Sequence, residues 1–152
     1  MPHRLLCVDP DDVTRSETVE RLGTELADLD LTVDSCVTLR DAERALRSET
    51  VAVITEYDLP DGSGLDLVRA ARDVCPDAGC ILYTDTDPDT IDTTDLRGSL
   101  TEYVGKDSLF GRDRLTKLVR TTVETRSQAS YPVPQTEGDR LAALRSYALD
   151  RE

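Results

Sequence analysis

Histidine, lysine and positive charge in general are scarce in this sequence. His3 is the only histidine, so acid–base catalysis by histidine has almost no candidate residue. The 152 residues include 31 acids and 18 bases, for a net charge of −13, and Lys106 and Lys117 are the only lysines. Because contacts to nucleic-acid phosphates need a basic patch, this composition excludes nucleic-acid binding by the segment.

Long apolar runs and metal-ligand spacings are also missing. No stretch approaches the roughly 18 to 20 apolar residues of a membrane span. The first twelve residues end in acidic residues and lack the apolar segment and cleavage site of a signal peptide. Cys7, Cys36, Cys75 and Cys80 have no metal-ligand spacing, so we expect inert thiols in a reducing cytoplasm. We therefore expect a cytoplasmic location and no membrane contact.

The dense negative charge carries a prediction of its own. Carboxylates at a surface keep water and cations close, and self-repulsion among them is screened by salt. An acidic, lysine-poor chain of this kind suits a cytoplasm of high salt, so we expect a halophile-like protein.

Apolar runs alternate five times with segments of helical periodicity. The expected strands are 4–8, 31–37, 51–55, 80–84 and 101–105. The expected helices are 13–29, a short one after the cap at Thr38, 65–74, 87–98 and 109–125, of which 87–98 has the fewest apolar residues. Short apolar strands separated by helices predict a doubly wound α/β domain around a five-stranded parallel sheet.

The character of the chain changes near residue 126. We expect one domain over 1–126 and a linker over 127–139, where two prolines and small polar residues gather. Residues 140–152 restart a helical pattern. They are interpreted either as a C-terminal helix or as the start of a truncated following domain, with a weak resemblance to the entry of a GAF-type sensor domain.

Polar residues follow four of the expected strands. Asp9 follows the first strand, Glu56 the third, Thr84 and Asp85 the fourth, and Lys106 the fifth. In an open α/β sheet these strand ends share one crevice. A carboxylate-bound cation, a hydroxyl and an ammonium are what phosphoryl transfer to a carboxylate requires.

Four short motifs resemble the receiver domains of two-component response regulators. They are LLCVDPDD, EYDLPDGSGLDLV, LYTD and EYVGKD, and the resemblance spans residues 3 to about 126. It implies a flavodoxin-like (βα)5 fold with strand order 2-1-3-4-5. It also implies roles for individual residues: phosphoacceptor position for Glu56, first acid for Asp9, switch threonine for Thr84, lysine for Lys106 and switch aromatic for Tyr103.

The sequence departs from the receiver pattern in the same motifs. The family's phosphoacceptor is an aspartate, whereas this chain has Glu56, and Pro10 stands where the second acid of a Mg²⁺ site belongs. Magnesium therefore has only a weak site through Asp9. Asp85 and Asp107 add negative charge beside the site. We interpret Glu56 as a fixed charge that pairs with Lys106, and a structural salt bridge in a degenerate receiver is an equal alternative.

The leading hypothesis is an atypical receiver, or pseudo-receiver, in a multidomain regulator. It acts without phosphorylation and without enzymatic activity, through contacts with a downstream sensor or output domain, a histidine kinase or another regulator. A conventional phosphorelay receiver phosphorylated on Asp58 or a nearby acid is the first alternative. A small phosphatase-like hydrolase, with Asp9 as nucleophile and Asp11 as general acid, is the second.

Overall fold

A computed structural model describes residues 2–92 and 102–129. Five strands form one parallel sheet in the order β2-β1-β3-β6-β7. These strands are β1 (His3–Val8), β2 (Leu31–Cys36), β3 (Thr50–Thr55), β6 (Gly79–Thr84) and β7 (Glu102–Gly105). Counting the strands of this sheet along the chain, the order is 2-1-3-4-5, so the predicted doubly wound sheet and its order are confirmed.

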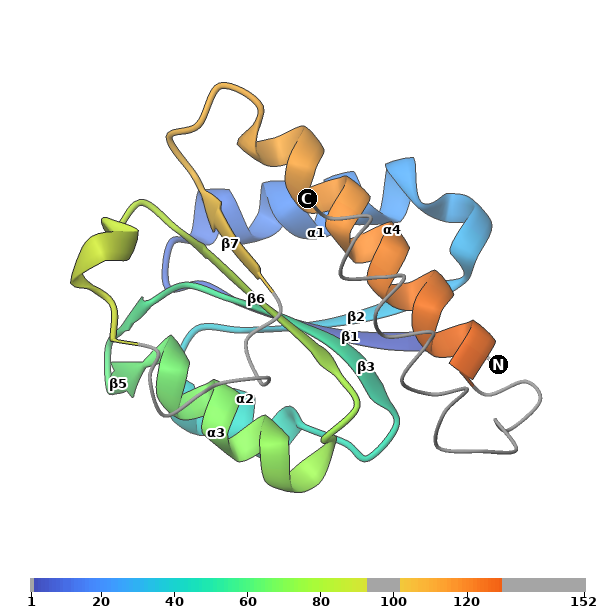
Figure 1. The fold of residues 1–152 in the computed structure, drawn as a ribbon, viewed down its shortest axis with the longest axis horizontal. Coiled ribbons are helices and arrows are strands. Elements are labelled where there is room, and N and C mark those ends of the chain that lie inside the picture. The colour runs from blue at the N-terminus through green and yellow to red at the C-terminus, as the bar shows by residue number, and fades with distance from the viewer. Residues whose placement is uncertain (1, 93–101, 130–152) are drawn as a thin grey trace.

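Helices cover both faces of the sheet (Figure 1). One face carries α1 (Asp12–Glu25) and α4 (Gly111–Ala129), and the other carries α2 (Leu39–Ala45) and α3 (Gly64–Val74). Two short 3-10 turns, η1 (Ala27–Leu29) and η2 (Pro88–Thr90), complete the helical elements of the described residues. Among these residues, no helix is long and apolar enough to cross a bilayer.

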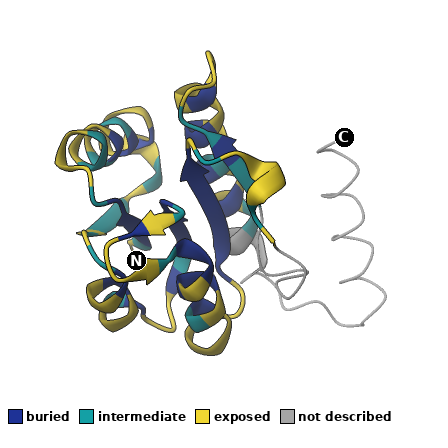
Figure 2. Ribbon diagram, turned by 90° about the vertical axis from the view of Figure 1, so that its left-hand side faces the viewer, coloured by how far each residue is buried: buried dark blue, intermediate teal, exposed yellow. Residues whose placement is uncertain are grey.

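Two apolar cores lie on either side of the sheet because strand side chains alternate between its faces. Leu6, Val53 and Leu82 pack into the core beneath α2 and α3. On the opposite face, Leu5 and Ile81 pack into the core beneath α1 and α4. Figure 2 shows the resulting buried strands between helices whose outward faces are exposed. This arrangement explains why the strands read as continuous apolar runs.

The cysteines belong to these layers, and none of the four forms a disulfide. Cys7, Cys75 and Cys80 are buried, and Cys36 is half-buried. Burial, with the Asp9 carboxylate nearby, raises the pKa of Cys7 to about 12. A thiol with so high a pKa holds almost no thiolate at neutral pH.

Several element ends differ from the sequence-based expectation. The first helix ends at Glu25, and η1 then leads to Asp30 in the left-handed region at φ 53°. In the predicted helix 87–98, the described part forms only η2, and 93–98 lie outside the described residues. Helix α4 continues to Ala129, three residues into the predicted linker, and the remainder of 127–152 also lies outside the description.

A small hairpin that the sequence analysis did not predict follows β3. It pairs β4 (Asp58–Leu59) with β5 (Gly62–Ser63), and its tip residue Asp61 accepts hydrogen bonds from the first two amides of α2, Leu39 N–H at 2.7 Å and Arg40 N–H at 3.0 Å. These bonds hold the pKa of Asp61 below its ordinary value. The hairpin therefore anchors the chain after Glu56 to a neighbouring helix.

Candidate functional site

The carboxyl ends of four sheet strands place four predicted site residues together. Asp9 and Lys106 come one residue after β1 and β7, Glu56 comes one residue after β3, and Thr84 is the last residue of β6. Counted over the whole residue, Asp9, Glu56 and Thr84 are only 4%, 9% and 1% exposed. The convergence expected from the strand pattern is present in the structure.

Lys106 lies between the two carboxylates. Its Nζ is 2.5 Å from Oε2 of Glu56 and 2.6 Å from Oδ2 of Asp9. Burial alone would lower the pKa of Lys106, but the hydrogen bonds and charges of Asp9 and Glu56 outweigh burial and raise it. The ammonium therefore stays protonated at neutral pH, and the expected pairing of Glu56 with Lys106 is confirmed.

The second oxygen of Glu56 is also fully engaged. Oε1 accepts hydrogen bonds from the Thr84 hydroxyl and from the backbone N–H of Tyr57, the latter at 2.7 Å. The Glu56 backbone is fixed as well, because its N–H donates to the Val8 carbonyl at 2.9 Å. A Cβ at Gly64 would collide with the Glu56 carbonyl, which explains the glycine at the start of α3. Glu56 is thus held in one position by strand, loop and helix.

Tyr103 lies close to this cluster without touching Glu56. Its ring packs against the core under α2 and α3, and its hydroxyl donates to the Thr86 carbonyl at 2.7 Å. The Thr84 carbonyl is farther away, at 3.5 Å. Burial raises the pKa of Tyr103, and the carboxylates nearby, Asp87 first among them, raise it further.

Other acids near the site point elsewhere. Asp11 precedes α1 and accepts the Thr14 hydroxyl at 2.5 Å, whereas Asp12 pairs with Arg15 at 2.6 Å. Asp58 is exposed, and its Oδ2 is 3.5 Å from the Thr86 hydroxyl. The structure therefore brings neither Asp11 nor Asp58 to Lys106.

The donor set does not fit a magnesium ion. Lys106 occupies the point where the two carboxylates converge, the other oxygen of Asp9 accepts the Asp11 N–H at 2.9 Å, and Pro10 offers no side-chain ligand. Among residues 2–92 and 102–129, no three histidine, cysteine or acidic side chains are grouped to hold a metal ion. Magnesium demands near-octahedral oxygen ligands. Here the Lys106 ammonium takes the place that such a cation would need between Asp9 and Glu56.

Residues that the sequence analysis missed complete the surroundings. Arg15 donates to the Asp9 carbonyl at 2.8 Å and so holds the loop between β1 and α1. The Tyr83 ring lies under the ammonium, with its centroid 5.8 Å from Lys106 Nζ. Thr86 lies between Thr84 and Tyr103. Nothing in the spacing of these residues singled them out, because each acts through a contact made only in the folded chain.

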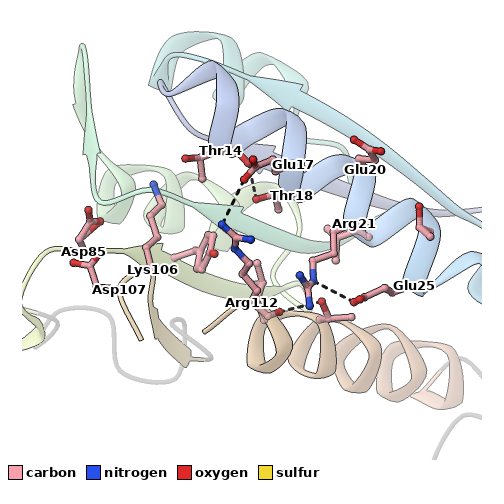
Figure 3. A pocket seen from close by; sticks show the side chains of 15 residues that line it. Thr14, Glu17, Thr18, Glu20, Arg21, Glu25, Asp85, Lys106, Asp107 and Arg112 are labelled. Atoms are coloured by element: carbon pink, nitrogen blue, oxygen red, sulfur yellow. Dashed lines mark hydrogen bonds and ion pairs between the residues drawn. The ribbon is translucent and has the colours of Figure 1, made fainter. Parts of the chain in front are cut away.

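A cleft of about 600 Å³ opens beside Lys106 between α1 and α4 (Figure 3). Arg112 and Glu17 approach across it to 3.7 Å, and Asp85 and Asp107 line it on the Lys106 side. We call this feature the α1–α4 cleft. Lys106 borders this cleft with only 15% of its side chain exposed, whereas Asp85 and Asp107 are exposed.

Comparison with known proteins shows which fold this chain has. No family model and no curated protein matches the sequence. Among solved structures, it is similar to a CheY-like response regulator receiver domain from Methanospirillum hungatei, with a TM-score of 0.69, 22% identity and coverage of 84% of this chain and 99% of the other. The fold is that of a receiver domain.

Two further solved structures share this receiver fold. One is the signal receiver domain of a putative Luxo repressor protein from Vibrio parahaemolyticus, with a TM-score of 0.69, 18% identity and coverage of 89% and 100%. The other is the response regulator DrrB from Thermotoga maritima, with a TM-score of 0.64, 22% identity and coverage of 83% of this chain and 54% of DrrB. Identities this low establish the fold alone.

Proposed function

We propose that this chain is a receiver-type signalling module that works without phosphorylation. Glu56 supplies a permanent negative charge that Lys106 and Thr84 bind, and the module acts through contacts with other domains or proteins rather than by catalysis. The single observation that carries the proposal is the position of the Lys106 ammonium, 2.5 Å from Glu56 and 2.6 Å from Asp9.

The engagement of Glu56 makes it a poor nucleophile. Oε2 is held by Lys106 and Oε1 accepts from Thr84 and Tyr57 N–H, so an incoming phosphoryl group would have to displace these partners. The exposed carboxylate of Asp85, which lines the α1–α4 cleft, repels a phosphate as well. Misplacement of a reacting group by about 1 Å can cost roughly a hundredfold in rate, and glutamate is one methylene longer than aspartate.

The two chemical alternatives have less support. A phosphoacceptor at Asp58 would need the lysine beside it, yet the Lys106 ammonium contacts Asp9 and Glu56. A hydrolase would need Asp9 and Asp11 facing a common substrate. Instead, Asp9 is bound by Lys106, and the Asp11 carboxylate accepts the Thr14 hydroxyl at the start of α1.

The proposal includes a setting for the module. We infer a cytoplasmic regulator in which a sensor or output domain follows in the same chain, with a histidine kinase or another regulator as outside partner. Two observations support this setting: four cysteines that form no disulfide, and the similarity to DrrB, in which the matched region is 54% of the chain.

The first test is phosphorylation by a small donor. The full chain is incubated with acetyl phosphate and Mg²⁺, and its intact mass is measured beside a DrrB receiver domain as positive control. We expect no added phosphate on this chain. A hydroxylamine-labile phosphate would contradict the proposal, and its location on Asp58 would establish the conventional alternative.

Matched variants sharpen this test. Glu56→Asp alone is expected to stay unphosphorylated, because Pro10 still provides no second acid. Glu56→Asp combined with Pro10→Asp gives both positions the acid of the receiver pattern, and we expect this double variant to gain phosphate. A double variant that stays inert would show that something other than these two positions prevents phosphorylation.

A second measurement separates a working switch from a structural salt bridge. The chain is labelled with 3-fluorotyrosine, and the ¹⁹F signal of Tyr103 is assigned by comparison with Tyr103→Phe. In a working switch, Glu56→Gln shifts the Tyr103 signal. In a merely structural salt bridge, the same variant lowers stability and leaves that signal in place.

A further inference from the structure

The α1–α4 cleft combines an apolar floor with charged side chains. Leu22 of α1 and Leu115 of α4 line it with only 1% and 3% of their surface exposed, and Tyr83 of β6 lines it with 6% exposed. We call these three residues the floor of the cleft. A volume of about 600 Å³ falls within the range of sites that bind small molecules. The cleft therefore has room for a small molecule with an aliphatic part.

Two hydrogen-bond donors that face this cleft are unused. The Tyr83 hydroxyl makes no hydrogen bond to any residue of 2–92 or 102–129, although buried polar groups are nearly always hydrogen-bonded. The Arg112 guanidinium donates none within these ranges either, because its acidic neighbour Glu17 is 3.7 Å away, beyond hydrogen-bond distance. Both groups are therefore available to a ligand in the cleft.

The surroundings of the Tyr83 hydroxyl are positively charged. Burial raises the pKa of Tyr83, whereas the charges of Arg112, Lys106 and Arg21 act in the opposite direction, that of Arg112 most strongly. The two unused donors thus lie in the same part of the cleft. A carboxylate suits this pair, because it accepts hydrogen bonds from a guanidinium and from a phenol at the same time.

Unused negative charge lies on the Lys106 side of the cleft. Asp85 and Asp107 are exposed and pair with no arginine, lysine or histidine of the described ranges, whereas Lys106 is already bound by two buried carboxylates. Asp85 follows Tyr83 by two residues, so the two side chains leave the same face of the sheet. Figure 3 shows Arg112 reaching from α4 towards α1, with both aspartates on the Lys106 side.

Neither a simple anion nor a simple cation matches this distribution of charge. Asp85 and Asp107 repel an anion, and Arg112 and Lys106 repel a cation that approaches Tyr83. A zwitterion avoids both conflicts, because its carboxylate faces the unused donors while its ammonium group faces the unpaired aspartates. An aliphatic chain between or beside these groups covers the apolar floor.

We propose that the α1–α4 cleft binds an aliphatic α-amino acid in its zwitterionic form. Arg112 and the Tyr83 hydroxyl bind its carboxylate, Asp85 and Asp107 bind its ammonium group, and the floor packs against its side chain. This site goes beyond the proposed function, because it gives the module a small-molecule ligand whether or not Glu56 accepts phosphate.

The first test compares three ligands that share one aliphatic group. The full chain is titrated in a calorimeter with L-leucine, with isoamylamine, which lacks the carboxylate, and with isocaproate, which lacks the ammonium group. We expect saturable binding of leucine and binding at least about tenfold weaker for the other two, because each has lost its charge-assisted hydrogen bonds on one side. The proposal is overturned if leucine, valine and isoleucine all fail to saturate, or if either leucine analogue binds as tightly as leucine.

Charge-matched variants test where the ligand lies. We expect Arg112→Gln to weaken leucine binding by about tenfold or more, and Asp107→Asn to weaken it less because Asp85 remains. Arg114→Gln and Asp73→Asn are the matched controls: Arg114 pairs with Glu102, and Asp73 is exposed on α3, on the opposite face of the sheet. Equal weakening by a variant and its control would reduce the effect to net charge and overturn the site.

A ¹⁹F measurement on the 3-fluorotyrosine-labelled chain locates the ligand directly. The signals of Tyr83 and Tyr57 are assigned by comparison with Tyr83→Phe and Tyr57→Phe. We expect leucine to move the Tyr83 signal with the Kd found by calorimetry and to leave Tyr57, which packs on the other face of the sheet, unchanged. A Tyr83 signal that stays in place while leucine binds overturns the site. The acetyl phosphate test is independent of these outcomes, so the proposed function stands or fails separately.

Discussion

The described residues contain two groups of ion pairs, which differ in burial rather than in distance. In the first, Lys106 contacts Glu56 at 2.5 Å and Asp9 at 2.6 Å, and the three side chains are 15%, 11% and 6% exposed. In the second, Arg120 contacts Asp28 at 2.8 Å with exposures of 38% and 60%. Near-equal distances thus occur in very different surroundings.

The surroundings decide what each group contributes. Exposed pairs such as Arg120–Asp28 join the α1 side of the molecule to α4, but water and salt screen them, and pairs of this class contribute little to stability. The Lys106 cluster joins the ends of β1, β3 and β7, where screening is weak. Loss of Lys106 there leaves two buried carboxylates without their counter-ion. The comparison predicts large effects at the strand ends and small ones between the helices.

Removal of the central cation should produce the largest effect. Lys106→Met leaves Asp9 and Glu56 as neighbouring buried carboxylates, and we expect a loss of about 3 to 5 kcal/mol in the free energy of unfolding. Urea unfolding followed by circular dichroism measures it. Lys117→Met is the control, because the only other lysine is exposed and should change stability little. Equal losses in the two variants would refute the comparison.

High pH should weaken the same cluster without a mutation. The folded-state pKa of Lys106 is raised above its ordinary value of 10.5, so its contribution is complete below about pH 10.5 and is lost as the pH rises through the folded-state pKa. We expect the difference in urea midpoint between wild type and Lys106→Met to be constant from about pH 7 to 10 and to shrink above that range. A difference that grows at high pH would contradict the raised pKa.

Salt should change stability less than Lys106→Met does. It should raise stability overall, although it also weakens the attraction within the exposed ion pairs. At a net charge of −13, repulsion outweighs attraction among surface charges, and molar KCl shortens the Debye length to about 3 Å. We expect the melting temperature to rise between dilute buffer and molar KCl. Lys106→Met should show the same rise, because its defect is buried. A melting temperature insensitive to salt would remove the argument for a high-salt cytoplasm.

The smallest effect is expected for the exposed pair itself. Arg120→Gln removes the two contacts to Asp28, at 2.8 and 2.9 Å, and the one to Glu124. We expect its urea midpoint to match that of wild type within error, in dilute buffer and in molar KCl alike. A loss approaching that of Lys106→Met would show that burial is not the deciding variable.

Features that leave a periodic pattern in the sequence could be predicted, and features that depend on contacts in the folded chain could not. The alternation of apolar runs and helical stripes was enough for the parallel sheet and for the positions of Asp9, Glu56, Thr84 and Lys106 at its edge. The strand order was predicted only through the resemblance to receiver domains. The hairpin over 58–63 was not predicted, because two-residue strands have no measurable periodicity.

The end of the first helix is a second case where local pattern was insufficient. Leu22 and Leu26 are both buried at helical spacing, which made 13–29 read as one helix. The helix nevertheless ends at Glu25, and η1 follows, so that the chain can turn through Asp30 into β2. The packing of α1 and β2 decides at which residue the helix ends, because the chain must turn there to enter the strand.

The sequence by itself determined which chemical groups reach the carboxyl edge of the sheet, because a strand of known length delivers the residue after it to a known place. Through its resemblance to receiver domains, it also predicted that Glu56 stands where that family has an aspartate and that Pro10 stands where the family has an acid. Only the tertiary structure decided that Asp9, rather than Asp11, shares the lysine, and that Thr86 links Thr84 to Tyr103. Those choices depend on hydrogen bonds between residues far apart in the chain, whose short range makes them sensitive to atomic positions that no spacing in the sequence records.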